Sequence, residues 1–127
     1  MMEEEPRTIL VIEDDADLRA AMRWALEMVG YAVTTANNGF EALKVVEQHS
    51  PDLILLDMHM PLMDGREFAQ ELRKSDHSEI PLVFVTASTE SRETGEIGAV
   101  AWVRKPFDLA SLIGTVKKHA RQTSCDL

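Results

Sequence analysis

Cysteine is almost absent from this chain of 127 residues, and its scarcity limits the compartments in which the protein is expected. Cys125 is the only cysteine, so no internal disulfide can form. Structural disulfides are common where conditions are oxidising and rare where thiols are kept reduced. We therefore expect a protein of a reducing compartment, with the cytoplasm as its location.

Long hydrophobic runs and linker-like segments are lacking as well. No apolar stretch approaches the roughly 20 residues of a membrane-spanning helix. The acidic segment Met1–Pro6 has no apolar stretch of the kind found in secretory signals. No repeat, low-complexity tract or Gly/Ser-rich linker divides the chain. We expect no membrane insertion and a single domain over residues 1–127, with its core between about residues 7 and 120.

Positive charge is in short supply. Lysine and arginine contribute 13 side chains against 22 from aspartate and glutamate, so the formal net charge is −9. Nucleic-acid binding depends on clustered lysine and arginine at the phosphates, and this balance therefore argues against direct contact with nucleic acid. It suits a protein that holds a cation or meets a basic partner surface.

The sequence does contain an alternation of short apolar runs with amphipathic stretches. Four apolar runs predict strands at residues 9–12, 53–56, 82–85 and 101–103, and a short stretch rich in valine and threonine predicts another at residues 32–36. Apolar residues at helical spacing follow the first run: Leu18, Met22, Leu26 and Val29. Gly30 is expected to end this helix. The alternation predicts an α/β fold with a five-stranded parallel sheet and helices on both of its faces.

The other helices are predicted from similar apolar faces. These faces comprise Ala42, Leu43 and Val46; then Phe68, Ala69 and Leu72; and finally Leu109, Leu112, Ile113, Val116 and Ala120. The segment Thr89–Ile97 stands where a fourth helix belongs, but it contains Gly95 and few apolar residues. We therefore expect that helix to be short or frayed.

Polar residues stand at the ends of four predicted strands. Glu13, Asp14 and Asp15 follow the first strand, Asp57 ends the third, Thr86 the fourth and Lys105 the fifth. Ligands of open parallel sheets bind beyond the carboxyl ends of the strands, so these groups are expected to meet. Each of these residues also has an ordinary alternative role, as a helix cap, a turn residue or a surface lysine. For Asp15 we expect the role of a helix N-cap.

Crowded carboxylates repel one another, and a hard cation such as Mg²⁺ relieves that repulsion through oxygen ligands. An aspartate can attack phosphorus to form an aspartyl phosphate. Phosphoryl transfer then needs mainly positioning and charge neutralisation. The Lys105 ammonium would supply positive charge, and the Thr86 hydroxyl a hydrogen bond. The sequence thus predicts phosphorylation of Asp57 beside Mg²⁺.

Four motifs together resemble the receiver domain of two-component response regulators, the CheY-like family. They are Ile9-Leu10-Val11-Ile12-Glu13-Asp14-Asp15, Asp57-Met58-His59-Met60-Pro61-Leu62-Met63-Asp64-Gly65, Val85-Thr86-Ala87 and Lys105-Pro106-Phe107. The resemblance runs from about Arg7 to Ala120 and implies a flavodoxin-like (βα)5 fold. It also implies a signalling switch rather than an enzyme. The implied phosphoryl donor is a histidine kinase or phosphotransfer protein, and the implied partner of the switch is a downstream protein target.

The resemblance implies a role for each site residue. Asp57 would accept the phosphoryl group, Asp14 and Asp57 would bind Mg²⁺ directly, and Glu13 would act through water. The backbone carbonyl of His59 would be a further ligand. Its imidazole beside carboxylates raises the alternative of a transition-metal site, but no second histidine stands at a ligand spacing.

Two side chains carry further hypotheses. The imidazole of His59 is expected to adjust the access of water to the acyl phosphate, and an unchanged dephosphorylation rate after its replacement would refute this. Trp102 stands where the family carries a switching tyrosine or phenylalanine, coupled to the threonine-type hydroxyl. Trp102 is either such a mobile group or simply a packed aromatic. Trp24 lies off the main apolar stripe of its helix and is expected to be partly exposed.

Two rival functions remain open at this point. The first is a haloacid-dehalogenase-type phosphatase, which also uses an aspartate nucleophile with threonine, lysine and Mg²⁺. Such enzymes carry the nucleophile on their first strand and a second aspartate two positions later. In this chain Asp57 ends the third predicted strand, and the residue two positions later is His59. The second rival is an interaction module that works without phosphorylation. The chain itself is either a complete single-domain regulator or a receiver from a longer protein.

Overall fold

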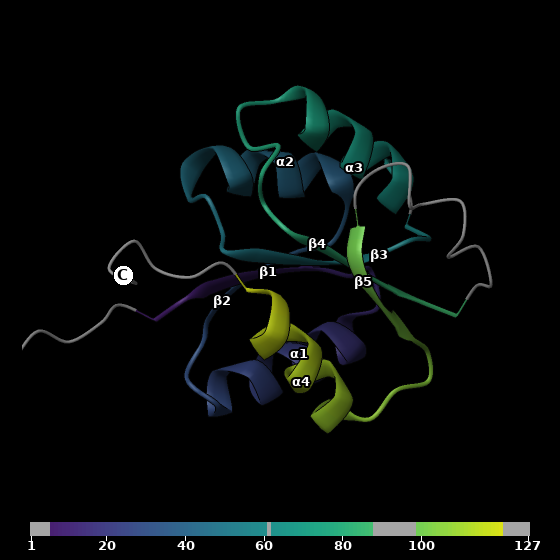
Figure 1. Ribbon diagram of the computed structural model, residues 1–127. Coiled ribbons are helices and arrows are strands. Elements are labelled where there is room, and N and C mark those ends of the chain that lie inside the picture. Colours follow the sequence, from purple (N-terminus) through teal and green to yellow (C-terminus); the bar gives the residue numbers. More distant parts are fainter. Residues whose placement is uncertain (1–5, 61, 88–98, 121–127) are drawn as a thin grey trace, which may run out of the picture.

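In the computed structural model, which describes residues 6–60, 62–87 and 99–120, five parallel strands form one sheet (Figure 1). The strands are β1 (Thr8–Ile12), β2 (Ala32–Ala36), β3 (Leu53–Asp57), β4 (Leu82–Thr86) and β5 (Ala99–Arg104). Their order across the sheet is β2-β1-β3-β4-β5. All five predicted strands are confirmed, and the largest difference is at β5, which is longer at both ends than the predicted run.

Helices cover both faces of the sheet, as predicted. Within the described ranges they are α1 (Ala16–Met28), α2 (Gly39–Gln48), α3 (Gly65–Lys74) and α4 (Leu109–His119). Figure 1 shows α1 and α4 on one face and α2 and α3 on the other. The segment 89–97, expected to form a short or frayed helix, lies outside the described residues.

The strands separate two hydrophobic cores because successive side chains point to opposite faces. Leu10, Ile12, Ile54 and Leu56 pack with buried residues of α2 and α3. Ile9, Val11, Leu53 and Leu55 pack with buried residues of α1 and α4. Burial on both faces explains why these strands are continuous apolar runs in the sequence.

Both ends of α1 follow known capping patterns. Asp15 is the N-cap, as predicted, and its Oδ1 accepts hydrogen bonds from the backbone N–H groups of Asp17 (3.0 Å) and Leu18 (3.2 Å). At the other end Gly30 has a φ of 102°, and its N–H donates to the carbonyl of Glu27 (3.0 Å). This left-handed residue ends the helix as predicted.

Val29 differs from the expectation that it continues the apolar stripe of α1. It is the C-cap residue and is 42% exposed. The helical turn that would have placed it against the sheet ends at Met28. Met22 and Leu26 are buried as predicted, and Leu18 is partly buried.

The pairing of the strands brings the predicted site residues to one edge. Asp57 pairs with Val85 between β3 and β4, and Thr86 pairs with Arg104 between β4 and β5. The Lys105 N–H then donates to the Thr86 carbonyl (2.9 Å), so Lys105 directly follows the last ladder pair. No described helix is both long enough and apolar enough to cross a membrane.

Candidate functional site

Three carboxylates meet where β1 and β3 end. One oxygen each from Glu13, Asp14 and Asp57 lies within 4.8 Å of the others. Glu13 is 1% exposed and Asp57 6% exposed, whereas Asp14 is exposed to solvent. A cluster of oxygen donors with one open side is the donor set that Mg²⁺ prefers, since this ion keeps several water or phosphate ligands. The residues present therefore fit a magnesium ion.

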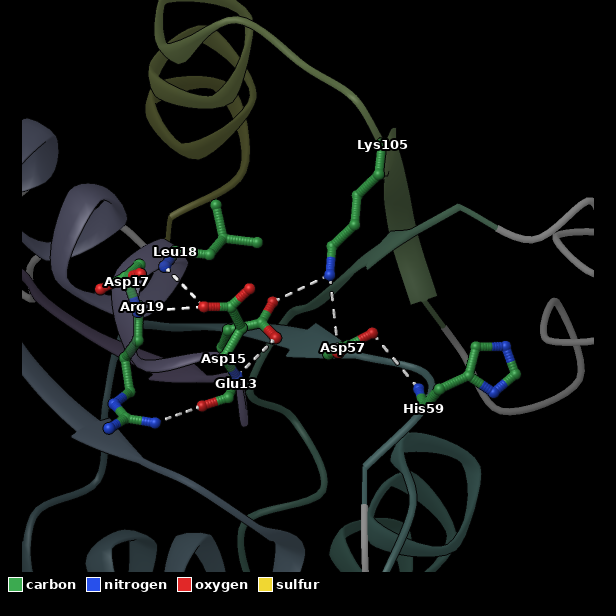
Figure 2. Close-up of polar contacts among 8 residues, drawn as sticks. All are labelled: Glu13, Asp15, Asp17, Leu18, Arg19, Asp57, His59 and Lys105. Carbon is green, nitrogen blue, oxygen red and sulfur yellow. Dashed lines mark hydrogen bonds and ion pairs between the residues drawn. The ribbon is translucent and has the colours of Figure 1, made fainter.

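The Lys105 ammonium lies between the two buried carboxylates (Figure 2). Its Nζ donates to Glu13 Oε1 at 3.0 Å and lies 3.5 Å from Asp57 Oδ2. Lys105 is partly buried, because it follows β5 directly and its side chain reaches across the edge of the sheet. The positive charge thus stands beside both acidic groups that the sheet buries.

The electrostatic setting alters the protonation of Glu13 and Lys105. Burial raises the pKa of Glu13 to about 7, against the opposing hydrogen bond from Lys105, and the negative charge of Asp57 raises it further. Burial alone lowers the pKa of Lys105, but its hydrogen bond to Glu13 and the charge of Asp57 outweigh this, so the net shift is upward. Lys105 therefore stays charged at neutral pH, and Glu13 is the group whose charge responds to its surroundings.

The loop after β3 holds Asp57 from its other side. The backbone N–H of His59 donates to Asp57 Oδ1 at 3.2 Å. The imidazole of His59 is exposed, and Figure 2 shows it directed away from the carboxylates. The carboxylate of Asp57 is thus oriented by the backbone of this residue and not by its ring.

The remaining two predicted residues lie on β4 and β5. Thr86 is the last residue of β4 and is 3% exposed. Trp102 is partly buried against the α2–α3 core and stacks on Phe84, with ring centroids 4.8 Å apart and an interplanar angle of 16°. This is the arrangement of a packed aromatic. Trp24 is 61% exposed, as expected.

Arg19 joins the site although the sequence reasoning did not single it out. Its Nη1 donates to the backbone carbonyl of Glu13 at 2.7 Å. The usable signal was its position on the first turns of α1, because long helical side chains point back toward the N-terminus of their helix. An arginine there lies over the β1–α1 turn, which carries Glu13 and Asp14.

Comparison with known proteins adds to this geometry. The family model for the response regulator receiver domain matches residues 9–117. A probable transcriptional regulator, ycf27, from Pyropia yezoensis is 41% identical over 124 residues, which cover 95% of this chain and 50% of the relative. Response regulator MprA from Mycobacterium sp. (strain KMS) is 37% identical over 124 residues, covering 95% and 54%. The chain spans about half the length of these curated relatives.

Solved structures give the same result. The chemotaxis protein CheY4 of Vibrio cholerae superposes with a TM-score of 0.85 at 30% identity, covering 90% of this chain and 98% of that one. TrrA of Thermotoga maritima, solved in complex with Mg²⁺ and BeF, gives a TM-score of 0.79 at 34% identity, covering 88% and 97%. The fold, the clustered strand-end residues and these matches agree. The chain belongs to the receiver-domain family of response regulators, the signalling modules of two-component systems.

Proposed function

We propose that this receiver domain accepts a phosphoryl group on Asp57 in a Mg²⁺-dependent reaction. The carrying observation is that Lys105 Nζ lies 3.5 Å from Asp57 Oδ2, within a cluster of three carboxylates at the edge of the sheet. A nucleophilic carboxylate, a cation site and a fixed ammonium are the components that phosphoryl transfer requires. The proposed donor is a phosphohistidine on a sensor histidine kinase or a phosphotransfer protein.

The proposed metal set is the one that the family resemblance implies, and the cluster of Glu13, Asp14 and Asp57 supports it. Asp14 and Asp57 would bind the ion directly, Glu13 would bind it through water, and the His59 backbone carbonyl would be a further ligand. When bound, Mg²⁺ supplies positive charge to the oxygens of the transferring phosphoryl group. The three carboxylates also repel one another less when a cation is held among them.

The protein side chains carry out the transfer. One carboxylate oxygen of Asp57 attacks phosphorus, the phosphorus–nitrogen bond of the donor breaks, and the imidazole nitrogen leaves with the bonding electron pair. The Lys105 ammonium neutralises charge beside the attacking carboxylate, and the Thr86 hydroxyl donates a hydrogen bond to a phosphoryl oxygen. The exposed His59 imidazole stands on the same loop, and its proposed role is to adjust the approach of water to the acyl phosphate.

The outcome of this chemistry is a switch and not the turnover of a substrate. Phosphorylation adds charge at the edge where β3, β4 and β5 end, and so biases the domain between two arrangements. Thr86 and Trp102 are the proposed switch residues. The partner is proposed to be a downstream protein target.

The proposed setting of this domain is the cytoplasm, without membrane insertion. Although two of the relatives above are named a transcriptional regulator and a response regulator, the net charge of −9 disfavours direct nucleic-acid contact by this chain.

The test is incubation with acetyl phosphate, with and without Mg²⁺, followed by intact mass measurement. We expect a Mg²⁺-dependent gain of one phosphoryl group in the wild type and none in Asp57→Asn, because the amide is not a nucleophile of this kind. A folded, Mg²⁺-binding wild type that shows no gain and forms no beryllofluoride complex would favour the phosphorylation-independent interaction module. Sustained hydrolysis of phosphate esters would favour the phosphatase.

A further inference from the structure

The β1–α1 turn is held by hydrogen bonds at each of the four polar atoms of Glu13. Its N–H donates to the Ala36 carbonyl at 3.1 Å, which ties it to the end of β2. Its side-chain oxygens accept from the Asp15 N–H at 3.2 Å and from Lys105 Nζ at 3.0 Å. The remaining group, the backbone carbonyl, accepts from Arg19 Nη1 at 2.7 Å.

The hydrogen bond from Arg19 also affects Asp14, because the peptide bond between Glu13 and Asp14 is planar. The carbonyl of Glu13 and the N–H of Asp14 belong to one rigid plane. A donor that fixes this oxygen therefore fixes the ψ angle of Glu13 and the φ angle of Asp14 together. These two angles help to set where the two carboxylates point.

The ends of the turn have other anchors. Glu13 is joined to the sheet through its N–H, and Asp15 is joined to α1 as the N-cap. Asp14 lies between them, is exposed, and contributes one of the three clustered carboxylates. Figure 2 shows the Arg19 side chain lying along this turn, on the side opposite Lys105. The orientation of the peptide before Asp14 thus depends on Arg19.

The geometry points to Arg19 as the positioning residue of the cation site. Through the Glu13 carbonyl it holds the carboxylates of Glu13 and Asp14 in the arrangement that meets Asp57. Partners that orient the ligands of a metal change its affinity by about 10- to 100-fold when they are removed. This inference rests on the proposed function, since it concerns the same Mg²⁺ site.

The sign of the expected effect separates positioning from plain electrostatics. Removing a positive charge near three carboxylates strengthens the binding of a cation, by Coulomb's law alone. Removing a positioning residue weakens it, because the ligands are then spread over several orientations. The two explanations predict opposite changes in the dissociation constant for Mg²⁺.

The chain offers a matched control one helical turn further along α1. Arg23 carries the same charge, but its Nε pairs with Glu27 at 3.1 Å on the exposed side of the helix. Arg23→Met and Arg19→Met remove the same group from the same helix. Only Arg19→Met removes the donor to the Glu13 carbonyl.

The experiment measures Mg²⁺ binding to the full chain by isothermal titration calorimetry, with circular dichroism to verify folding. We expect the dissociation constant of Arg19→Met to rise about 10-fold and that of Arg23→Met to stay within about twofold of the wild type. Arg19→Lys keeps a charged donor on a long stem and is expected to restore most of the affinity. If Arg19→Met does not fold, Arg19→Lys and Arg19→Gln supply the comparison, with the weaker binding expected for glutamine.

The labelling rate with acetyl phosphate provides a second readout. As the Mg²⁺ concentration is raised, we expect the labelling rate of Arg19→Met to reach half its maximum at about 10-fold higher Mg²⁺ than that of the wild type. Unchanged or tighter Mg²⁺ binding by folded Arg19→Met would overturn the positioning role while leaving the proposed function intact. A wild type that binds no Mg²⁺ would overturn the proposed function, and this inference with it.

Discussion

At the scale of single residues, the site is organised around Glu13, whose carboxyl group has little contact with water. It is 1% exposed and is held by Lys105 and by the Asp15 N–H. A carboxylate in such a place is costly unless positive charge compensates it. The Lys105 ammonium compensates the negative charge in part, yet burial still raises the pKa of Glu13 to about 7. The proposed binding of Mg²⁺ would therefore be linked to the ionisation of Glu13 at neutral pH.

The pKa of Glu13 predicts a pH dependence of stability in the absence of metal. Its folded pKa of about 7 lies above the ordinary value of 4.5, so the folded state holds this proton more tightly than the unfolded state does. The resulting stabilisation is complete below pH 4.5 and is lost as pH rises through about 7. With EDTA present, we expect the free energy of unfolding of the wild type to fall between pH 5 and pH 8 relative to Glu13→Gln.

Urea unfolding at several pH values measures this difference, and using the difference between the two proteins cancels the other titrating groups. Saturating Mg²⁺ should reverse this fall in the free energy of unfolding, because the cation binds the ionised carboxylate. The affinity of the folded protein for Mg²⁺ is expected to rise with pH up to about 7. Parallel pH curves for the two metal-free proteins would show that Glu13 does not titrate in this range.

At the scale of elements, α3 packs closely against the loop that follows β3. The Gly65 N–H donates to the Met58 carbonyl at 2.9 Å. A Cβ atom at Gly65 would clash with the Asp57 carbonyl oxygen and would lie 2.9 Å from Met58 Cα. Asp64 meanwhile caps the helix in a reciprocal pair with Glu67. The first turn of α3 thus sits directly against the backbone of the proposed phosphoacceptor.

Gly65→Ala tests this close packing. Backbone atoms cannot move aside as a flexible side chain does, so we expect a loss of about 1–3 kcal/mol in the free energy of unfolding. Labelling of Asp57 by acetyl phosphate should also slow, because the carbonyl of that residue must shift. Unchanged stability and labelling would show that the loop accommodates the methyl group.

The control for this test is Gly114→Ala in α4. A Cβ at Gly114 would meet no atom within 4 Å, and the residue is exposed in the interior of a helix. Alanine is favoured over glycine at such a position by about 0.5–1 kcal/mol. The same substitution is therefore expected to stabilise the protein in α4 and to destabilise it in α3, and urea unfolding measures both.

At the scale of the whole molecule, one sheet is shared by two hydrophobic cores. Every strand contributes residues to the core on the α2–α3 side, to the core on the α1–α4 side, or to both. Neither core can form without the sheet, whose central strand is β3, flanked by β1 and β4. We propose on this ground that the chain is a single domain, with residues 7–120 as its core.

A single domain of this kind is expected to unfold in one cooperative transition. Tryptophan fluorescence in a Trp24→Phe variant reports on Trp102, which packs against the α2–α3 core. Far-UV circular dichroism reports on all helices together. The two urea midpoints are expected to coincide, and separated midpoints would argue for two units that unfold independently.

Much of the fold was predictable because its signals are local. The inner strands β1, β3 and β4 are buried on both faces and are continuous apolar runs, so they could be located directly from the residues. The edge strands β2 and β5 are shorter or more mixed runs with β-branched residues, a composition that also favours strands. The caps Asp15 and Gly30 were recognisable for the same reason, since they act on neighbouring backbone groups. The strand-end positions of Asp57 and Thr86 followed from the ends of these runs.

The contacts that complete the site depend instead on how distant segments pack. Lys105 and Glu13 are 92 positions apart, and their ion pair exists because β1 and β5 belong to one parallel sheet. The pKa of Glu13 depends on burial by neighbours from several elements, which no local pattern reveals. The residues themselves thus establish which groups the chain carries to the edge of its sheet. The distances among these groups arise from the pairing of the strands, and the contacts of Arg19 and Gly65 arise from the packing of α1 and α3 against that edge.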